Sequence, residues 1–145
     1  MVYMITLENI FVQAIKNGKK TIEVRTRIPK NLSPGDAILI AQKASHGRVV
    51  LCCKVSQILE MHPDKLYSNY REQIYCFFSY YRHYTHGRDK VFGIALTDIF
   101  VFPDHITTQS FLLERAPQWF TYIPLAVFVH VMNKYISKYY YYGNY

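Results

Sequence analysis

A chain of 145 residues, half of them hydrophobic, has the size and apolar content of a single domain with one core. Its 17 Lys and Arg exceed its 10 Asp and Glu, and the formal net charge of +7 favours a polyanionic partner such as nucleic acid. An odd count of three cysteines argues against a disulfide framework, and no apolar run reaches the roughly 20 residues that span a bilayer, so we expect no membrane partner and a cytoplasmic or other reducing intracellular compartment.

Strand and helix signals alternate over the first part of the chain. Residues 2–6 predict a strand, and apolar residues at three- and four-residue spacing predict a helix that ends at Gly18. These apolar residues are Leu7, Ile10, Phe11, Ala14 and Ile15. Alternation over residues 20–25 predicts a second strand with one face toward the core. Further strands are predicted at residues 37–41, after a Pro-Gly turn, and at residues 49–59.

The second half of the chain is richer in aromatic residues. Residues 63–86 carry apolar and aromatic side chains at mostly helical intervals, which predicts an aromatic helical insert, and residues 91–102 predict a strand. The apolar stretch at residues 125–132 fits either a strand or a short helix. A Tyr-rich tail at residues 139–145 is expected to fray rather than pack, which leaves a single domain over residues 1–138.

Two local motifs resemble the signature of a known family. The run IKNGKKTIEVR at residues 15–25, followed by LSPGDAILI at residues 32–40, is similar to the signature of the ASCH domain. The resemblance implies an α+β fold, a small PUA-like β-barrel with flanking helices, and a cleft beside the barrel that binds RNA or modified nucleic acid. A few similar bacterial proteins hydrolyse the acetyl amide of acetylcytidine with Lys, Thr and Glu; Lys20 matches that Lys, whereas Glu23 stands where the Thr belongs.

The basic segment at residues 16–30 is the main candidate for contact with nucleic acid. It holds six cations and one anion, and each phosphate that a cation neutralises releases counterions and adds salt-dependent affinity. We therefore predict a basic cleft beside the barrel that holds a nucleotide or base, of RNA rather than DNA. The residues expected to bind from this segment are Lys19, Lys20, Thr21, Arg25 and Arg27. The alternative is a basic loop that is merely solvated.

Two further segments carry aromatic rings, and the first of them also combines the rings with cations, as proteins that bind single strands do. Arg82, His83 and Arg88 lie among tyrosines in the first segment, and Trp119 in the second could stack on a base or pack in the core. We expect no metal ion and no other cofactor, because His83 and His86 lack a second pair of ligands at metal-site spacing.

Two other classes of function stay open. A hydrolase acting on RNA or on a modified nucleoside would use Lys20 as a base, with Glu23 and a second carboxylate, Glu72. On a regular strand Lys20 and Glu23 would point to opposite faces, so a shared site requires Lys20 to lie where the strand begins; otherwise the two form an exposed ion pair. A protein-interaction module would use the aromatic insert or the Tyr-rich tail.

Overall fold

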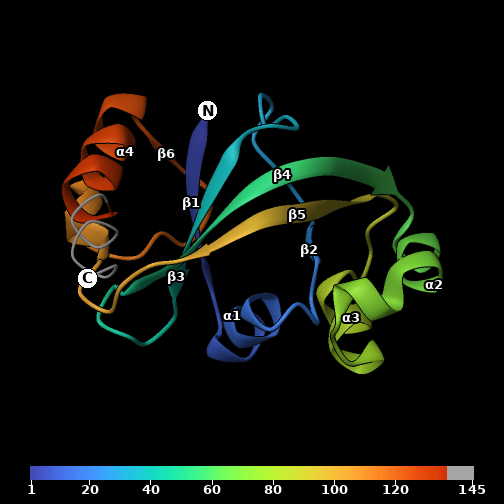
Figure 1. The fold of residues 1–145 in the computed structure, drawn as a ribbon. Helices are drawn as coiled ribbons and strands as arrows, with labels where there is room; N and C mark the ends of the chain where they lie inside the picture. The colour runs from blue at the N-terminus through green and yellow to red at the C-terminus, as the bar shows by residue number, and fades with distance from the viewer. Residues whose placement is uncertain (137–145) are drawn as a thin grey trace.

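A computed structural model describes residues 1–136, which form one curled sheet with helices on its faces and at its ends (Figure 1). The strands are β1 (Val2–Leu7), β2 (Ile22–Arg25), β3 (Ala37–Gln42), β4 (Val49–Met61), β5 (Val91–Val101) and β6 (Thr121–Ile123). The helices are α1 (Asn9–Lys16), α2 (Pro63–Ile74), α3 (Phe78–Tyr84), the 3₁₀ turn η1 (Thr108–Phe111), α4 (Leu125–Val131) and the π-helical turn η2 (Met132–Ile136). The predicted α+β class is confirmed.

The sheet has the strand order β2-β5-β4-β3-β1-β6 and curls into a half-barrel. Only β1 and β3 run parallel; the other neighbours are antiparallel. The long pair β4 and β5 shifts register at two points along its length, and such irregularities bend strands. As a result β2, at one edge, approaches the segment before β6 at the other: the Arg25 guanidinium carbon lies 5.5 Å from the centre of the Phe120 ring.

Both faces of the central strands are buried. On one face, α1 packs its Val12 and Ile15 against a cluster that includes Ile5. On the other face, Met4 joins a cluster with Phe111 of η1 and residues of α4. A strand covered on both sides needs no polar face, which explains why residues 2–6 alternate only weakly. Helix α1 begins at Asn9 and buries Val12, Ala14 and Ile15. Ile10, one of the apolar positions of the predicted helix, is exposed.

The predicted aromatic helical insert consists of two helices. Tyr75 ends α2 in the left-handed region, with φ 50° and ψ 60°, and α3 begins at Phe78. Helix α3 then folds back on α2, because the buried Tyr81 hydroxyl donates to the Pro63 carbonyl at 2.6 Å. Helix α2 lies tight on β5: a Cβ built on Gly93 would come within 3.1 Å of a Leu66 methyl carbon. This packing makes a third apolar cluster at the end of the sheet.

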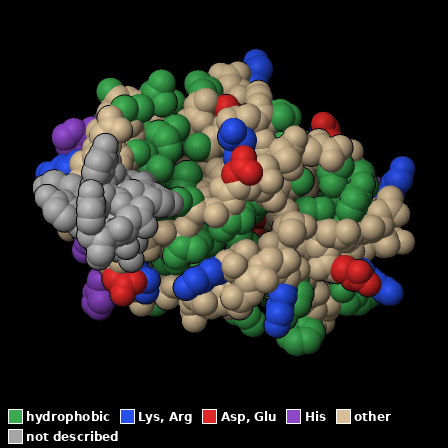
Figure 2. All heavy atoms as spheres, viewed as in Figure 1, with side chains coloured by type: hydrophobic (Ala, Val, Ile, Leu, Met, Phe, Trp, Pro, Cys, Tyr) green, Lys and Arg blue, Asp and Glu red, His purple; other side chains and the backbone are tan. Residues whose placement is uncertain are grey.

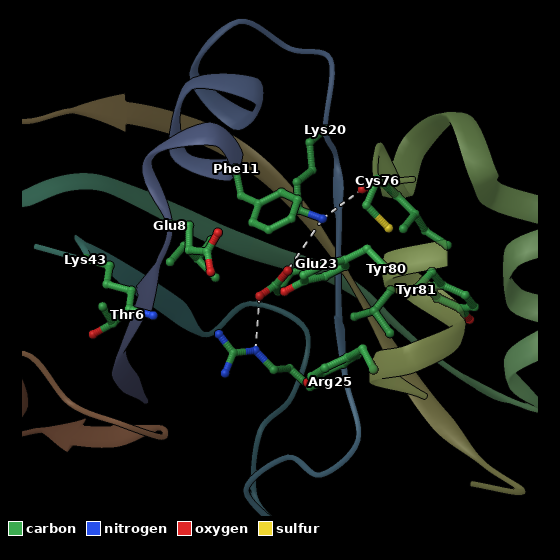
Figure 3. A pocket seen from close by; sticks show the side chains of 14 residues that line it. Thr6, Glu8, Phe11, Lys20, Glu23, Arg25, Lys43, Cys76, Tyr80 and Tyr81 are labelled. Atoms are coloured by element: carbon green, nitrogen blue, oxygen red, sulfur yellow. Dashed lines mark hydrogen bonds and ion pairs between the residues drawn. The ribbon is translucent and has the colours of Figure 1, made fainter. Parts of the chain in front are cut away.

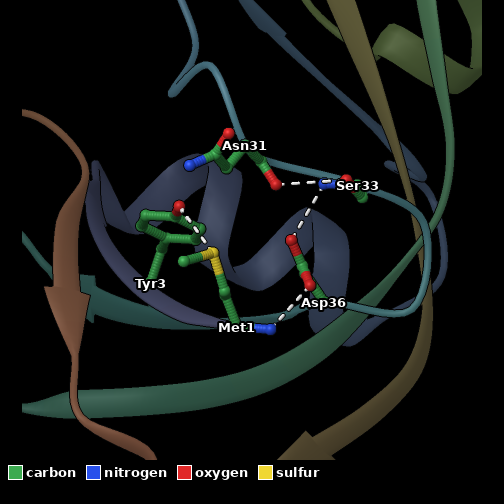
Figure 4. Close-up of polar contacts among 5 residues, drawn as sticks. All are labelled: Met1, Tyr3, Asn31, Ser33 and Asp36. Carbon is green, nitrogen blue, oxygen red and sulfur yellow. Dashed lines mark hydrogen bonds and ion pairs between the residues drawn. The ribbon is translucent and has the colours of Figure 1, made fainter.

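The turn before β3 is held by one carboxylate (Figure 4). Asp36 accepts a hydrogen bond from the Ser33 backbone N–H at 2.8 Å, and Gly35, with φ +93°, supplies the backbone conformation that the turn needs. The second oxygen of Asp36 accepts from the Met1 amino group at 2.7 Å. These contacts bring the start of β3 beside the start of β1, its parallel neighbour.

The C-terminal part departs from the sequence-based expectations in two ways. The stretch left open between strand and helix is helical, as α4, and a strand that was not predicted, β6, pairs with β1. The tail at residues 139–145, and the domain boundary at residue 138, lie outside the described residues and stay predictions. In the part of the chain described, no helix is both long and apolar enough to cross a bilayer.

Candidate functional site

A pocket of about 210 Å³ opens between the start of α1, strand β2 and helix α3 (Figure 3). Its walls come from four places in the chain: the junction of β1 and α1, the residues before and within β2, the residue after β3, and the α2–α3 segment. This volume is below the roughly 300 Å³ at which sites for drug-sized ligands begin, so the pocket suits a group no larger than a single base.

Lys20 lies just before β2 and reaches into this pocket although its side chain is only 3% exposed. Its Nζ donates to the carbonyl oxygens of Ile22 and Ile74, each at 2.8 Å, and lies 3.5 Å from Glu23 Oε1. The ammonium group thus makes two hydrogen bonds to backbone carbonyls and an ion pair with the Glu23 carboxylate. Lys20 therefore acts as a clamp between β2 and the end of α2.

Glu23 and Arg25 share one face of β2, as residues two apart on a strand do. Arg25 Nε donates to Glu23 Oε2 at 3.0 Å, and the Arg25 side chain is 14% exposed. The guanidinium plane packs near Phe120, and its two terminal nitrogens, which point away from Glu23 in Figure 3, have no partner among residues 1–136. Glu23 thus orients Arg25 and leaves its outer fork available to an anion or a carbonyl oxygen.

Aromatic rings form the opposite wall of the pocket. Tyr80 lies 5.6 Å from Phe11, and the rings of Tyr80 and Tyr84 are nearly parallel, with centroids 6.5 Å apart and an interplanar angle of 9°. The Lys20 ammonium lies 5.2 Å from the Phe11 ring centre. Burial raises the pKa of the Tyr80 hydroxyl, with smaller contributions in the same direction from Glu8 and Glu23, so the hydroxyl stays protonated near neutral pH.

Cys76 also lines the pocket, beside Lys20 and Glu23. Burial raises the pKa of its thiol; the positive charge of Lys20 opposes this shift and the negative charge of Glu23 adds to it. A thiol with a raised pKa carries little thiolate near neutral pH. The pocket therefore presents hydrogen-bond donors, flat rings and a paired carboxylate rather than an activated nucleophile.

The structure gathers three of the predicted residues in the pocket and leaves the others outside its lining. Lys20, Glu23 and Arg25 line it together, because Lys20 precedes the first residue of β2 and so escapes the alternation of the strand. Lys19 and Thr21 are exposed and do not line the pocket, and the Thr21 backbone N–H donates to the Gln73 carbonyl at 2.9 Å; their contact with nucleic acid stays a prediction.

Arg27 and Trp119 meet outside the pocket. The Arg27 guanidinium carbon lies 5.6 Å from the centre of the Trp119 ring, and that ring packs edge-on against Phe120. Because Phe120 also packs against Arg25, the pair adjoins the pocket without lining it. Trp119 is exposed on one side, so the expectation of a ring open to a ligand is compatible with its place in the fold.

The remaining predicted residues belong to the two helices of the insert. Arg82, His83 and Arg88 are exposed on α3 and on the turn that follows it. Glu72 is exposed on α2 and does not line the pocket, because the residue that turns inward at the end of this helix is Ile74. The structure thus separates Glu72 from Lys20 and Glu23. No group of three or more His, Cys, Asp or Glu side chains gathers anywhere within residues 1–136.

Sequence reasoning missed several lining residues. Glu8 and Lys43 come from the ends of β1 and β3, which only the parallel pairing of these strands brings together. Phe11 was predicted only as an apolar position of the first helix, and Tyr80 was not singled out within the aromatic insert, yet both form part of the pocket wall. The helical spacing included Phe11, but spacing alone does not distinguish a buried face from the wall of a pocket.

Comparisons with known proteins agree with this architecture. The family model of the ASCH domain matches residues 5–127. A crystal structure of an ASCH protein from Zymomonas mobilis aligns with a TM-score of 0.83 and 23% identity, over 92% of this chain and 94% of that chain. A mutant of that protein aligns with a TM-score of 0.82 and 24% identity, over 91% of this chain and 94% of that chain. At such identities the likeness shows the fold alone, and it confirms the predicted barrel. Among curated proteins, none matches this sequence.

Proposed function

Because the chain belongs to the ASCH domain family, we propose that it is an RNA-binding module that holds one nucleotide or base in the pocket beside β2. The family resemblance implies a cleft beside the barrel that receives RNA or modified nucleic acid, and the pocket occupies such a position (Figure 3). The formal net charge of +7 supports a polyanionic partner. Flat rings on one wall and donors on the other are the two features that recognition of an unpaired base requires.

The main observation that supports this proposal is the geometry of Arg25. Its side chain is largely buried, its Nε is fixed by Glu23, and its terminal nitrogens lack a partner in the described part of the chain. A ligand that supplies acceptors to these terminal nitrogens would form charge-assisted hydrogen bonds with a guanidinium that Glu23 already holds in place. A phosphate or the acceptor edge of a base can accept hydrogen bonds from both terminal nitrogens of the guanidinium at once.

The test is a titration of labelled single- and double-stranded RNA and DNA at low and at moderate salt. We expect single-stranded RNA to bind with an affinity that falls steeply as salt rises. Arg25→Ala should weaken binding by about 1–3 kcal/mol, because it removes the paired donors. Lys19→Ala is the matched control: it removes an exposed cation of the same segment that does not line the pocket. Salt-insensitive binding, or equal losses in the two variants, would overturn the proposal.

One observation favours a second candidate, hydrolysis of RNA or of a modified nucleoside. Lys20 Nζ and Glu23 Oε1 lie 3.5 Å apart in the pocket, where a substrate amide or phosphate would meet both. Lys20 would first have to give up one of its two hydrogen bonds to backbone carbonyls, or its ion pair with Glu23, in order to act as a base. Acetylcytidine and RNA incubated with fresh protein distinguish the candidates, since a hydrolase consumes substrate and loses turnover in Lys20→Ala, whereas a binding module leaves both substrates intact.

A further inference from the structure

A row of aromatic rings begins in the pocket and continues along α3 to the surface. Phe11 contacts Tyr80, and the ring of Tyr84 lies parallel to that of Tyr80 one helical turn further on. Tyr80 and Tyr84 are 49% and 39% exposed. Phe77, the residue before α3, has an extended backbone conformation and is 80% exposed. We call Phe77, Tyr80 and Tyr84 the α3 aromatic row.

Two unpaired cations lie in the same segment of the chain as these rings. Arg82 lies on α3 and Arg88 follows it, both exposed and without an ion-pair partner among the described residues. Lys90 differs, because its Nζ pairs with Glu60 Oε1 at 2.7 Å. Figure 2 shows apolar and basic side chains interspersed over the part of the surface that α2 and α3 form. Exposed rings set among free cations are the combination found on surfaces that bind single-stranded nucleic acid.

We infer that the α3 aromatic row stacks the bases that neighbour the one in the pocket, so that the ligand is a single-stranded RNA segment longer than one nucleotide. This inference rests on the proposed function. A base in a duplex has its faces covered by its neighbours, whereas an unpaired base can lie flat on a ring such as Phe77. Phosphates between the stacked bases would then pass close to Arg82 and Arg88, which supply the counter-charges.

The charges favour RNA over a protein surface as the occupant. An apolar protein partner would have to cover Arg82 and Arg88 together with the rings, and burying unpaired guanidinium groups is costly. RNA instead pairs them with phosphates while its bases cover the rings. The row is also continuous with the pocket through Phe11 and Tyr80, so one strand can occupy both without a break.

The experiment compares two probes, a mononucleotide and a longer single-stranded oligoribonucleotide, by fluorescence anisotropy or calorimetry. Phe77 does not line the pocket, so Phe77→Ala should leave mononucleotide binding unchanged and weaken binding of the oligoribonucleotide by about 5- to 150-fold. Phe77→Trp should restore the affinity, because it returns a flat ring. Phe77→Leu should behave like the Ala variant, because it keeps apolar area but has no π face, whereas a protein partner would tolerate it.

Controls separate this inference from the function on which it rests. Tyr122→Ala removes another exposed ring, 52% exposed, from β6, which lies far from α3 in Figure 1, and it should change neither probe. If Arg25→Ala abolishes binding and Phe77→Ala does not affect the oligoribonucleotide, the aromatic row is refuted and the proposed function stands. If no RNA binds, the proposed function fails and the inference with it. An equal loss for duplex and single-stranded RNA in Phe77→Ala also refutes stacking.

Discussion

The Nζ of Lys20 donates a hydrogen bond to the carbonyl oxygen of Ile74 at 2.8 Å, across 54 residues of sequence. Ile74 is the last residue of α2, where carbonyl groups lack helical partners and a positive charge is favoured. Thr21, which follows Lys20 in the chain, adds a hydrogen bond from its backbone N–H to the Gln73 carbonyl. The segment before β2 therefore fixes the end of α2, and the position of the helical insert is coupled to the charge in the pocket.

Replacing Lys20 by Met tests this coupling. Lys20→Met leaves Glu23 with one partner, Arg25, and leaves two buried carbonyl oxygens without the donor that joins them. Removing one member of a buried ion pair lowers the free energy of unfolding by about 3–5 kcal/mol. Urea denaturation followed by circular dichroism measures the change.

Two variants complete this experiment. Lys19→Met, at the exposed neighbouring position, should change the free energy of unfolding by less than about 0.5 kcal/mol. The double variant Lys20→Met/Glu23→Gln should recover part of the loss, because it removes the carboxylate that the single variant leaves underpaired. Equal stability of Lys20→Met and the unaltered protein would show that the clamp contributes nothing to the fold.

The contact between α3 and α2 is tested at Tyr81. Tyr81→Phe keeps the buried ring but removes the hydroxyl that donates to the Pro63 carbonyl at 2.6 Å. We expect the free energy of unfolding to fall by about 1–3 kcal/mol, the cost of a buried acceptor left unsatisfied, and amide exchange in α3 to accelerate. Tyr84→Phe, at an exposed position of the same helix, is the control and should exchange as the unaltered protein does.

The adjacent cysteines of β4 predict how stability depends on pH. Burial raises the pKa of Cys52 from 9.0 to about 11 and that of Cys53 from 9.0 to about 12. The folded state therefore keeps protons that the unfolded chain loses above pH 9.0. The stabilisation is complete below about pH 9 and decreases as pH rises toward 11 and 12, by up to about 1.4 kcal/mol per pH unit for each thiol.

Denaturation in reducing buffer over a series of pH values measures this decrease. Cys53→Ala should make the alkaline slope shallower whatever it does to the stability at neutral pH, since only the slope reports the lost titration. A slope that is the same in this variant and in the unaltered protein would mean that the thiols do not titrate on unfolding.

The salt dependence of RNA binding should distinguish free from paired cations around α3. Arg82→Ala should reduce the slope of log affinity against log salt by about one, because one phosphate contact disappears. Lys90→Ala should change it less, because Lys90 already pairs with Glu60 at 2.7 Å. Titrations at several salt concentrations give the slopes. Equal changes in the two variants would argue against phosphate contacts at Arg82.

Short-range patterns explain which parts of the site were predictable. Alternation along β2 placed Glu23 and Arg25 on one face, and the family motif singled out Lys20. The break at Tyr75 was not predictable, because a left-handed tyrosine breaks the expected pattern without Gly or Pro to mark it. Without that break α3 could not fold back on α2, and Tyr80 would not reach the pocket.

The sequence by itself determined the class of the fold, the order of most strands and helices, the family, and the basic motif around Lys20, since each of these depends on spacing within short segments or on composition. Only the tertiary structure decided that Lys20 clamps the end of α2, that the outer fork of Arg25 faces the pocket unpaired, and that Glu72 lies elsewhere. Those relationships depend on the curl of the sheet and on contacts between segments far apart in the chain, and local periodicity carries no information about either.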